Sequence, residues 1–330
     1  MASAEQIKAL LESHVEGDDG RFFSIALQVA AHEAKIGHGK LAQQLRDLVT
    51  RSKKSRSAEV LQSAPIPISK AYKGISGLLH ATNPNHRLKD LIVDEKLSGR
   101  LDRIVREQKH FSQLRNHGLQ PRHKLLLVGP SGTGKTLTAS VLAGELGLPL
   151  FTVRLDAVIT KYMGETAAKL RQVFDAIADV RGVYFFDEFD AIGSQRGLAN
   201  DVGEVRRILN SFLQMIEQDN SNSLIIAATN HPDILDAALF RRFDDIIRYQ
   251  MPEAPAITQL LKGRLSPYVK AGFRWAKAVN AAKGLSGAEI TRAANEAIKE
   301  KLIEQKDHIA MLDILHALEE RREFSQQDTL

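Results

Sequence analysis

The sequence contains no cysteine, which excludes disulfide bonds, thiolate metal ligands and cysteine nucleophiles. It also has no apolar run of about 18 residues, the length that a transmembrane helix needs. The first residues, MASAEQIKALLES, lack the uninterrupted apolar stretch of a secretory signal. Internal repeats and long low-complexity tracts are absent too. We therefore expect a cytoplasmic protein without a membrane partner.

The composition is that of an ordinary folded protein, with 26% charged and 43% hydrophobic residues among 330. This length leaves room for two or three compact units. The formal net charge of +5 is modest. Basic proteins often bind nucleic acid, but many bind nucleotides or gain solubility in this way, so the charge alone does not choose a partner.

Three short patterns of helical apolar spacing occur near the N-terminus, at residues 7–15, 22–29 and 41–49. We expect a small helical domain over residues 1–50 and a linker over residues 51–87, which is rich in charge, serine and proline. The alternative for its basic stretch RSKKSRS is a nuclear-localisation or DNA-binding arm. The stretch HEAKI does not form a zinc-protease motif, because Ile36 stands where the second histidine belongs.

From about residue 88 onward, apolar runs alternate with helical patterns. The runs lie at residues 125–128, 150–155, 182–186, 223–229 and 245–249. This alternation predicts a parallel sheet that is covered by helices on both faces. After Pro252 the pattern is helical to about residue 322. We expect a large α/β domain over residues 88–252 and a helical domain over residues 253–330.

The segment GPSGTGKT follows the first of these predicted strands and begins a helical run. It is a phosphate-binding loop in the strand–loop–helix context that the motif requires, and a glycine-rich turn without a ligand is the weaker alternative. Backbone N–H groups and the helix N-terminus would hold the phosphates, Lys135 would reach the β- and γ-phosphates, and Thr136 would bind Mg²⁺. The expected nucleotide contacts are Gly129, Pro130, Ser131, Gly132, Thr133, Gly134, Lys135, Thr136 and Leu137.

Polar residues also follow two later strands. VYFFDEFD ends a predicted strand with Asp187 and Glu188, and AATN ends the next one with Asn230. The carboxyl ends of parallel strands meet beside the phosphate loop, so Asp187 would hold Mg²⁺ and Glu188 would act as general base toward a water. Asn230 would position that water, although it could merely begin a turn. The sequence thus predicts ATP and Mg²⁺ as cofactors.

Six segments in this order and spacing resemble the AAA+ ATPases, and more narrowly the AAA-proper group that includes katanin and spastin. They are GPSGTGKT, TKYMGET, VYFFDEFD, AATN, LDAALFRRFD and GLSGAEI. The resemblance runs from about Lys89 to Ala310. It implies a P-loop NTPase fold with a five-stranded parallel sheet and a helical lid. It further implies a homo-oligomeric ring, usually a hexamer, with nucleotide between the subunits.

The resemblance also assigns residues outside the phosphate loop. It implies that Arg241 and Arg242 are arginine fingers for a neighbouring subunit's nucleotide, whereas capping of helix carbonyls is the plainer alternative. Gly287 and Ala288, at a helix start with the sequence of a capping box, would lie at the adenine and ribose. Residues 91–93 would contact the adenine, although the family's usual segment there contains glycine.

The segment TKYMGET combines apolar and mobile residues. The resemblance implies that Lys161, Tyr162, Met163 and Gly164 form a loop in the central pore of the ring. An aromatic ring and a thioether make apolar contacts with almost any polypeptide, so such a loop can grip an unfolded protein. Residues 197–203 would form a second pore loop. The alternative is that Tyr162 and Met163 are core residues of a turn.

We therefore expect an ATP-driven ring motor that remodels, disassembles or unfolds protein substrates by threading them through a pore. The chain carries no protease motif, but some AAA+ unfoldases feed a separate peptidase, which is a further candidate partner. A nucleic-acid motor or loader is the main alternative, although no DNA-binding module is recognisable. A non-catalytic scaffold is disfavoured by the intact Lys135, Asp187 and Glu188.

Overall fold

The computed structural model of the protein describes residues 19–36, 38–39, 42–44, 47, 77–159, 163–190, 202–234 and 237–327. The chain divides into two compact units, Met1–Ile66 and Pro67–Leu330. In the first unit, helix α2 (Asp19–Lys35) contains the second of the helices that the sequence predicts. The other two predicted helices lie largely outside the described residues.

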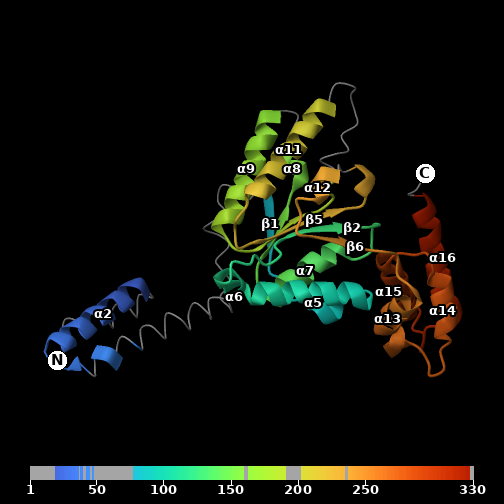
Figure 1. Ribbon diagram of the computed structural model, residues 1–330. Helices are drawn as coiled ribbons and strands as arrows, with labels where there is room; N and C mark the ends of the chain where they lie inside the picture. Colours follow the sequence, from blue (N-terminus) through green and yellow to red (C-terminus); the bar gives the residue numbers. More distant parts are fainter. Residues whose placement is uncertain are drawn as a thin grey trace. The chain divides into compact units, whose positions relative to one another are not determined.

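The larger unit is built on a six-stranded sheet (Figure 1). Its strand order is β1-β3-β4-β5-β2-β6. Neighbouring strands run parallel from β3 to β6. These five strands are β2 (Lys124–Val128), β3 (Leu150–Val153), β4 (Val183–Phe186), β5 (Leu224–Thr229) and β6 (Asp245–Arg248). Each coincides with one of the strands predicted from the sequence, so the α/β class with a parallel sheet is confirmed.

The sixth strand, β1 (Leu79–Thr82), was not predicted. It pairs antiparallel with β3, with Leu79 opposite Val153. The sequence analysis places these residues in the linker, whereas the structure includes them in the sheet. A four-residue edge strand with one face in water has too short a pattern to stand out, and its pairing partner lies some seventy residues further along the chain.

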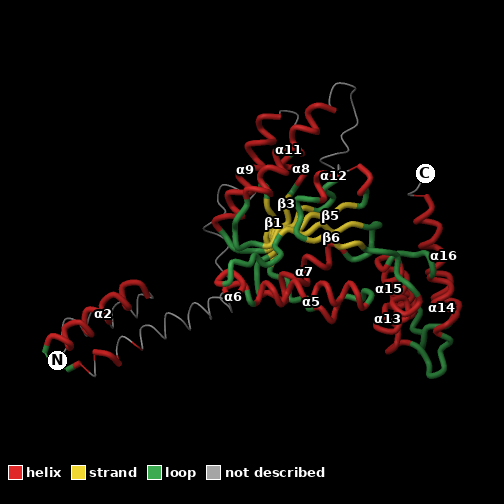
Figure 2. The backbone as a smooth tube through the Cα atoms, viewed as in Figure 1, coloured by secondary structure: helices red, strands yellow, loops and turns green. Residues whose placement is uncertain are grey.

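Helices cover both faces of the sheet (Figure 2). Helices α9 (Met163–Asp179) and α11 (Val202–Gln218) pack on one face, and α5 (Glu95–Lys109) and α7 (Lys135–Leu146) pack on the other. Successive side chains of β4 enter opposite cores: Phe186 packs on the α9 and α11 side, and Phe185 on the α5 and α7 side. This explains why the strand reads as a continuous apolar run.

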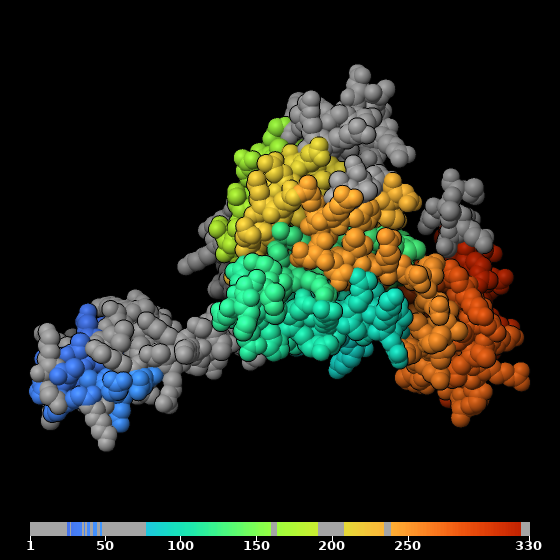
Figure 3. Space-filling view, in the orientation of Figure 1, coloured from blue at the N-terminus to red at the C-terminus, as the bar shows by residue number. Residues whose placement is uncertain are grey.

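Four helices form a lobe of their own at the C-terminal end of the larger unit (Figure 3). They are α13 (Ala254–Leu265), α14 (Trp275–Ala282), α15 (Gly287–Ile303) and α16 (Met311–Gln327). Their shared core includes Leu261, Ile290 and Leu318, all shielded from solvent. The predicted helical C-terminal part is therefore confirmed.

The described part of the larger unit also contains short elements: α6 (Phe111–Asn116), α8 (Leu155–Val158), α12 (Ala237–Phe240), and the 3₁₀ helices η1 (Leu88–Asp90), η2 (Pro232–Ile234) and η3 (Ser266–Tyr268). Among the described residues, no helix has both the length and the apolar character that crossing a membrane requires. The cytoplasmic location stays a prediction.

Candidate nucleotide site

The loop between β2 and α7 contains three glycines with positive φ, Gly129, Gly132 and Gly134, and at the first two a Cβ atom would also collide with its neighbours. Gly129 has a φ of 153° and Gly132 a φ of 72°. A Cβ atom on Gly129 would lie 2.5 Å from the carbonyl oxygen of Tyr249, and one on Gly132 would lie 2.4 Å from Oγ of Ser286. Backbone conformation and space therefore both require glycine, as a loop that wraps a phosphate demands.

Lys135 begins α7 and links the loop to the end of β5. Its Nζ atom donates hydrogen bonds to the carbonyl oxygens of Gly129 at 2.7 Å and Pro130 at 2.8 Å. It donates a third hydrogen bond to Oδ1 of Asn230, at 2.7 Å. Two residues that the sequence assigns to one nucleotide site are thus in direct contact.

The electrostatics around Lys135 suit a group that binds a polyanion. Its side chain is almost fully buried, and this burial lowers the pKa of the ammonium group, while the nearby Asp187 and Asp190 raise it. Two carboxylates beside a buried ammonium keep the charged form available. Lys135 can therefore attract phosphate oxygens in a region with little competing water.

Thr136 and Asp187 form the candidate metal site. The Thr136 hydroxyl donates a hydrogen bond to Oδ2 of Asp187, at 2.8 Å, across the gap between α7 and the end of β4. Within the part of the chain that the structure describes, no group of three or more histidine or acidic residues could hold a metal. A hydroxyl and a carboxylate fit Mg²⁺, which usually takes one or two protein ligands and completes its shell with phosphate and water.

Glu188 adopts a left-handed backbone conformation, with a φ of 48°. This conformation is unfavourable for a residue with a side chain and is concentrated at functional sites. The turn is held on both sides, because the Glu188 N–H bonds to Oδ1 of Asp187 at 3.0 Å and the buried Phe189 bonds to the Ala228 carbonyl at 2.8 Å. Glu188 itself is exposed beside the candidate metal site.

Asp190 is a site residue that the sequence analysis did not assign. Its side chain is buried, and its Oδ1 atom accepts a hydrogen bond from the backbone N–H of Asn230, at 3.3 Å. It therefore joins the turn after β4 to the end of β5. Its place at the end of the acidic run DEFD was the available signal, but a buried acid cannot be told from a surface acid by sequence alone.

The start of helix α15 contacts the phosphate loop directly. The Ala288 N–H donates to the carbonyl oxygen of Gly132 at 3.0 Å, and the Oγ atom of Ser286 accepts from the Glu289 N–H at 3.2 Å. Only this half of the predicted capping box forms, because the Glu289 carboxylate pairs with Arg292. Gly287 lies between these contacts, so both residues predicted to meet the adenine and ribose adjoin the loop.

The other predicted adenine segment lies nearby. Leu91 is buried, and its Cδ1 atom is 3.6 Å from the position that a Cβ atom on Gly134 would take. Val93 packs against the same core as α7. Residues 91–93 therefore border the end of the phosphate loop, and their contact with adenine stays a prediction.

The structure places Arg241 and Arg242 away from this site. They precede β6, whose first residue, Asp245, pairs with Leu125 near the start of β2. The phosphate loop follows the other end of β2. Five residues of extended strand span roughly 16 Å, and this length separates the two ends of β2. Arg242 forms an ion pair with Glu217 of α11, and Arg241 is exposed.

The predicted pore loops lie mostly outside the described residues. This applies to Lys161 and Tyr162, and to residues 197–201 of the second loop. Met163 and Gly164 are the first residues of α9, and Gly164 is exposed. Their role in gripping a substrate stays a prediction.

Comparison with known proteins agrees with this site. Residues 125–251, which include the phosphate loop and the acidic turn, match the ATPase family associated with various cellular activities (AAA). An uncharacterized AAA family ATPase, y4kL of Sinorhizobium fredii, is 36% identical over 321 residues, which are 97% of this chain and 96% of the relative. The chain belongs to the AAA family of ATPases. It is accordingly a nucleotide-binding enzyme that hydrolyses ATP.

Other relatives of this AAA ATPase are longer. The ATP-dependent zinc metalloprotease FtsH 1 of Methylacidiphilum infernorum is 35% identical over 230 residues, which are 66% of this chain and 36% of the relative. FtsH of Helicobacter pylori is 33% identical over 235 residues, again 36% of its length. Among solved structures, the FIGL-1 AAA domain has a TM-score of 0.58 and 24% identity, covering 73% of this chain and 85% of that domain, and it supports the fold.

Proposed function

We propose that this AAA ATPase assembles into a homo-oligomeric ring, usually a hexamer in this family, and hydrolyses ATP between neighbouring subunits. The main support is the separation of two groups of residues. Lys135 and Asp187 lie at the carboxyl ends of the parallel strands, whereas Arg241 precedes β6 and lies near their amino ends. A second copy can bring its arginines to the first copy's loop, and repetition of this one contact closes a ring.

In this proposal each residue of the site has one task. Lys135 exchanges its bonds to the loop carbonyls for bonds to the β- and γ-phosphates, and Thr136 and Asp187 hold Mg²⁺, which would neutralise phosphate charge. Glu188 accepts a proton from the attacking water, and Asn230 orients that water. The neighbour's Arg241 or Arg242 stabilises the charge that develops on the transferred phosphoryl group.

We also propose that hydrolysis drives the remodelling or unfolding of a protein substrate. The FtsH relatives are named ATP-dependent zinc metalloproteases, which supports a protein substrate. The apolar segment around Tyr162 supports a grip that does not depend on the substrate sequence. A separate peptidase is a further candidate partner, which the names of these relatives support.

The N-terminal residues 1–50 complete the proposal as a module that recruits partners. Helix α2 has exposed polar positions beside buried ones such as Val29 and Ala30. An amphipathic helical unit of this kind can fold on its own small core and present its outer face to a partner. The linker that follows is rich in serine, lysine and proline.

The protein-substrate proposal is tested by what stimulates the ATPase. We expect a permanently unfolded protein to raise the rate of phosphate release, and DNA to leave it unchanged over a salt series. The Lys135→Ala variant is the control for contaminating ATPases. Stimulation by DNA that falls steeply with salt, without stimulation by the unfolded protein, would instead identify a nucleic-acid motor.

A further inference from the structure

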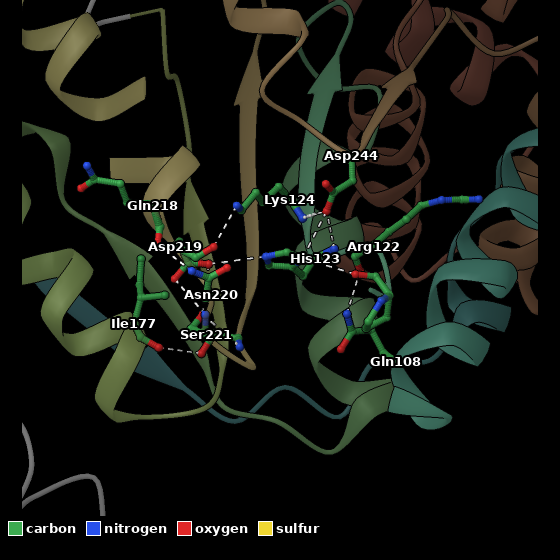
Figure 4. Close-up of polar contacts among 12 residues, drawn as sticks. Gln108, Arg122, His123, Lys124, Ile177, Gln218, Asp219, Asn220, Ser221 and Asp244 are labelled. Carbon is green, nitrogen blue, oxygen red and sulfur yellow. Dashed lines mark hydrogen bonds and ion pairs between the residues drawn. The ribbon is translucent and has the colours of Figure 1, made fainter. Parts of the chain in front are cut away.

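His123, Asp219 and Asp244 form a second polar cluster (Figure 4). It lies at the amino ends of the parallel strands, whereas the phosphate loop lies at their carboxyl ends. His123 immediately precedes β2, and its ring lies between two carboxylates. Its Nδ1 atom is 3.3 Å from Oδ2 of Asp244, and its Nε2 atom is 3.6 Å from Oδ2 of Asp219. The side chains of His123 and Asp219 are only 12% and 4% exposed. Asp244 is more exposed, at 34%. No step at the nucleotide site uses this charge cluster.

Asp244 is fastened to the beginning of β2 by the backbone as well. Its Oδ2 atom accepts hydrogen bonds from the N–H groups of His123 at 2.8 Å and Lys124 at 2.9 Å. Its own N–H donates to the Lys124 carbonyl at 2.8 Å. On the other side, the Lys124 ammonium bonds to the carbonyl oxygen of Asp219 at 3.0 Å, which attaches the end of α11 to the same strand.

This cluster holds the turn at residues 241–244, which carries the two arginines and is here named the arginine turn. Asp244 follows Arg242 by two residues, and the residue between them, Phe243, is buried in the core. Arg242 pairs with Glu217, which precedes Asp219 by two residues at the end of α11. The turn is therefore attached at one end to β2 and at the other to α11, and His123 lies between these attachments.

We propose that His123 is a positioning residue for the arginine pair, clamping Asp244 and Asp219 so that the arginine turn is held rigidly for the neighbouring subunit. The inference rests on the proposed role of Arg241 and Arg242 in trans. A rigid turn loses less conformational freedom when its arginines meet the phosphates, and small misplacements of such groups cost rate. The clamp therefore acts on turnover rather than on nucleotide binding.

The charge on His123 follows from the groups that face it. These are Asp219 from the end of α11, Asp244 from the turn before β6, and Lys124 on its own strand. Burial, the largest influence, lowers the pKa, but the two carboxylates outweigh burial and Lys124 and raise the pKa of His123 to about 9. In the folded protein His123 therefore keeps its charge at neutral pH and loses it as the pH rises through about 9. Because this pKa lies above the unfolded value of 6.5, the contribution of the charged pairs to stability is complete below pH 6.5 and is lost as the pH rises through about 9.

The test compares His123→Gln and His123→Lys in the full chain, with the exposed His117→Gln as a matched control. We expect His123→Gln to lower kcat at least tenfold at neutral pH while KM for ATP and the affinity for a fluorescent nucleotide stay within twofold. His123→Lys keeps a charge, so it should retain most of the activity. Above pH 9 the wild type should fall toward the His123→Gln rate, and His123→Lys should not.

Other groups, Lys135 included, also lose protons at high pH, but the wild type and His123→Lys have all of these groups in common. The difference between the wild-type and His123→Lys profiles therefore isolates the histidine. Profiles that coincide would overturn the proposal. If His123→Gln fails to fold in a thermal melt, this comparison still decides the matter.

Subunit mixing tests the positioning role of His123 separately from the proposed action of Arg241 and Arg242 in trans. Lys135→Ala subunits keep an intact arginine turn and His123→Gln subunits keep an intact loop, so mixed rings should regain activity. If mixing restores activity to Arg241→Ala/Arg242→Ala subunits but not to folded His123→Gln subunits, the positioning role of His123 is rejected. The action of the arginines on the neighbouring subunit's nucleotide is then retained. If neither is rescued in rings that demonstrably mix, the trans arginines fail and the clamp fails with them.

Discussion

Lys135 and Asn230 are joined by a hydrogen bond of 2.7 Å between Nζ and Oδ1, which connects the start of α7 to the end of β5. Asn230 is held from its other side by the carboxylate of Asp190, which accepts its N–H. The asparagine is therefore fixed relative to the lysine that is proposed to hold the γ-phosphate. A small shift of Lys135 would be transmitted to the residue that is proposed to orient the water.

We predict that Asn230→Ala lowers kcat by about 100-fold, the usual loss for one polar contact to a transition state. ATP affinity should change little, because Lys135 keeps its loop contacts and its charge. Steady-state kinetics and a nucleotide titration measure the two effects separately. Asn220→Ala, at an exposed asparagine beyond α11, is the matched control. A parallel loss of binding and turnover would show that Asn230 shapes the phosphate pocket instead.

Glu188→Gln should abolish turnover and leave ATP binding intact, because the amide keeps the shape of the side chain but cannot accept a proton. The left-handed φ of 48° adds a second expectation, for Glu188→Gly. Glycine adopts this conformation without strain, so this variant should be inactive and yet melt no lower than the wild type. Phosphate release and thermal melts measure the pair. Hydrolysis at the wild-type rate in Glu188→Gln would remove Glu188 from catalysis.

The contact between the phosphate loop and α15 can be tested with two glycines. Gly132 and Gly147 both have left-handed backbones, with φ of 72° and 63°. A Cβ atom on Gly132 would collide with Ser286, whereas one on Gly147 would meet nothing within 4 Å. Gly147→Ala should cost only about 1–2 kcal/mol of stability and keep ATP affinity. Gly132→Ala should also weaken ATP binding at least tenfold in a titration, and equal affinities would show that the loop tolerates separation from α15.

Arg241→Ala/Arg242→Ala should lower kcat by about 10³-fold or more, as loss of an arginine finger does. Mixing these subunits with Lys135→Ala subunits should restore activity, because some interfaces then pair an intact loop with intact arginines. Phosphate release after equimolar mixing measures the rescue. A mixture of Lys135→Ala with Glu188→Gln is the control, since neither subunit has both an intact phosphate loop and an intact Glu188, and it should stay inactive. Absence of rescue in rings that demonstrably mix would argue against action in trans.

The sequence was sufficient for features that short segments encode. The loop GPSGTGKT, the apolar run of β4 and the acidic turn after it each signal their structure within about ten residues. The rule that parallel strands end at one sheet edge then predicted that Asp187 and Asn230 lie near the loop, and both contact its lysine or threonine.

Features that depend on distant partners were not predictable in this way. The strand β1 is defined by its pairing with β3, and the buried state of Asp190 by the end of β5. His123 reads as an ordinary polar residue before a strand, and its two carboxylates lie some hundred residues further along the chain. Hydrophobic periodicity carries no information about such pairings, because each needs the completed fold to bring its members together.

Tyr162→Ala should uncouple hydrolysis from work on a substrate. Tyr162 belongs to the predicted pore loop and not to the phosphate site, so basal ATPase should persist within a few-fold while unfolding of a model substrate is lost. Removing the aromatic ring of Tyr162 deletes apolar contact with the threaded chain worth on the order of 1–3 kcal/mol per subunit. Every subunit of the oligomer loses this contact. Tyr162→Phe is the matched control, and it should be nearly neutral if the grip is apolar.

The opposite interpretation, in which Tyr162 is a core residue, makes a different prediction for the same proteins. Truncating a buried tyrosine leaves a cavity and costs about 3–5 kcal/mol of stability. Tyr162→Ala would then melt at a lower temperature, and its ATPase and unfolding activities would fall together. Thermal melts, phosphate release and unfolding of one substrate, measured on the wild type and both variants, separate the two cases. A parallel loss of stability and ATPase would rule out the pore-loop role.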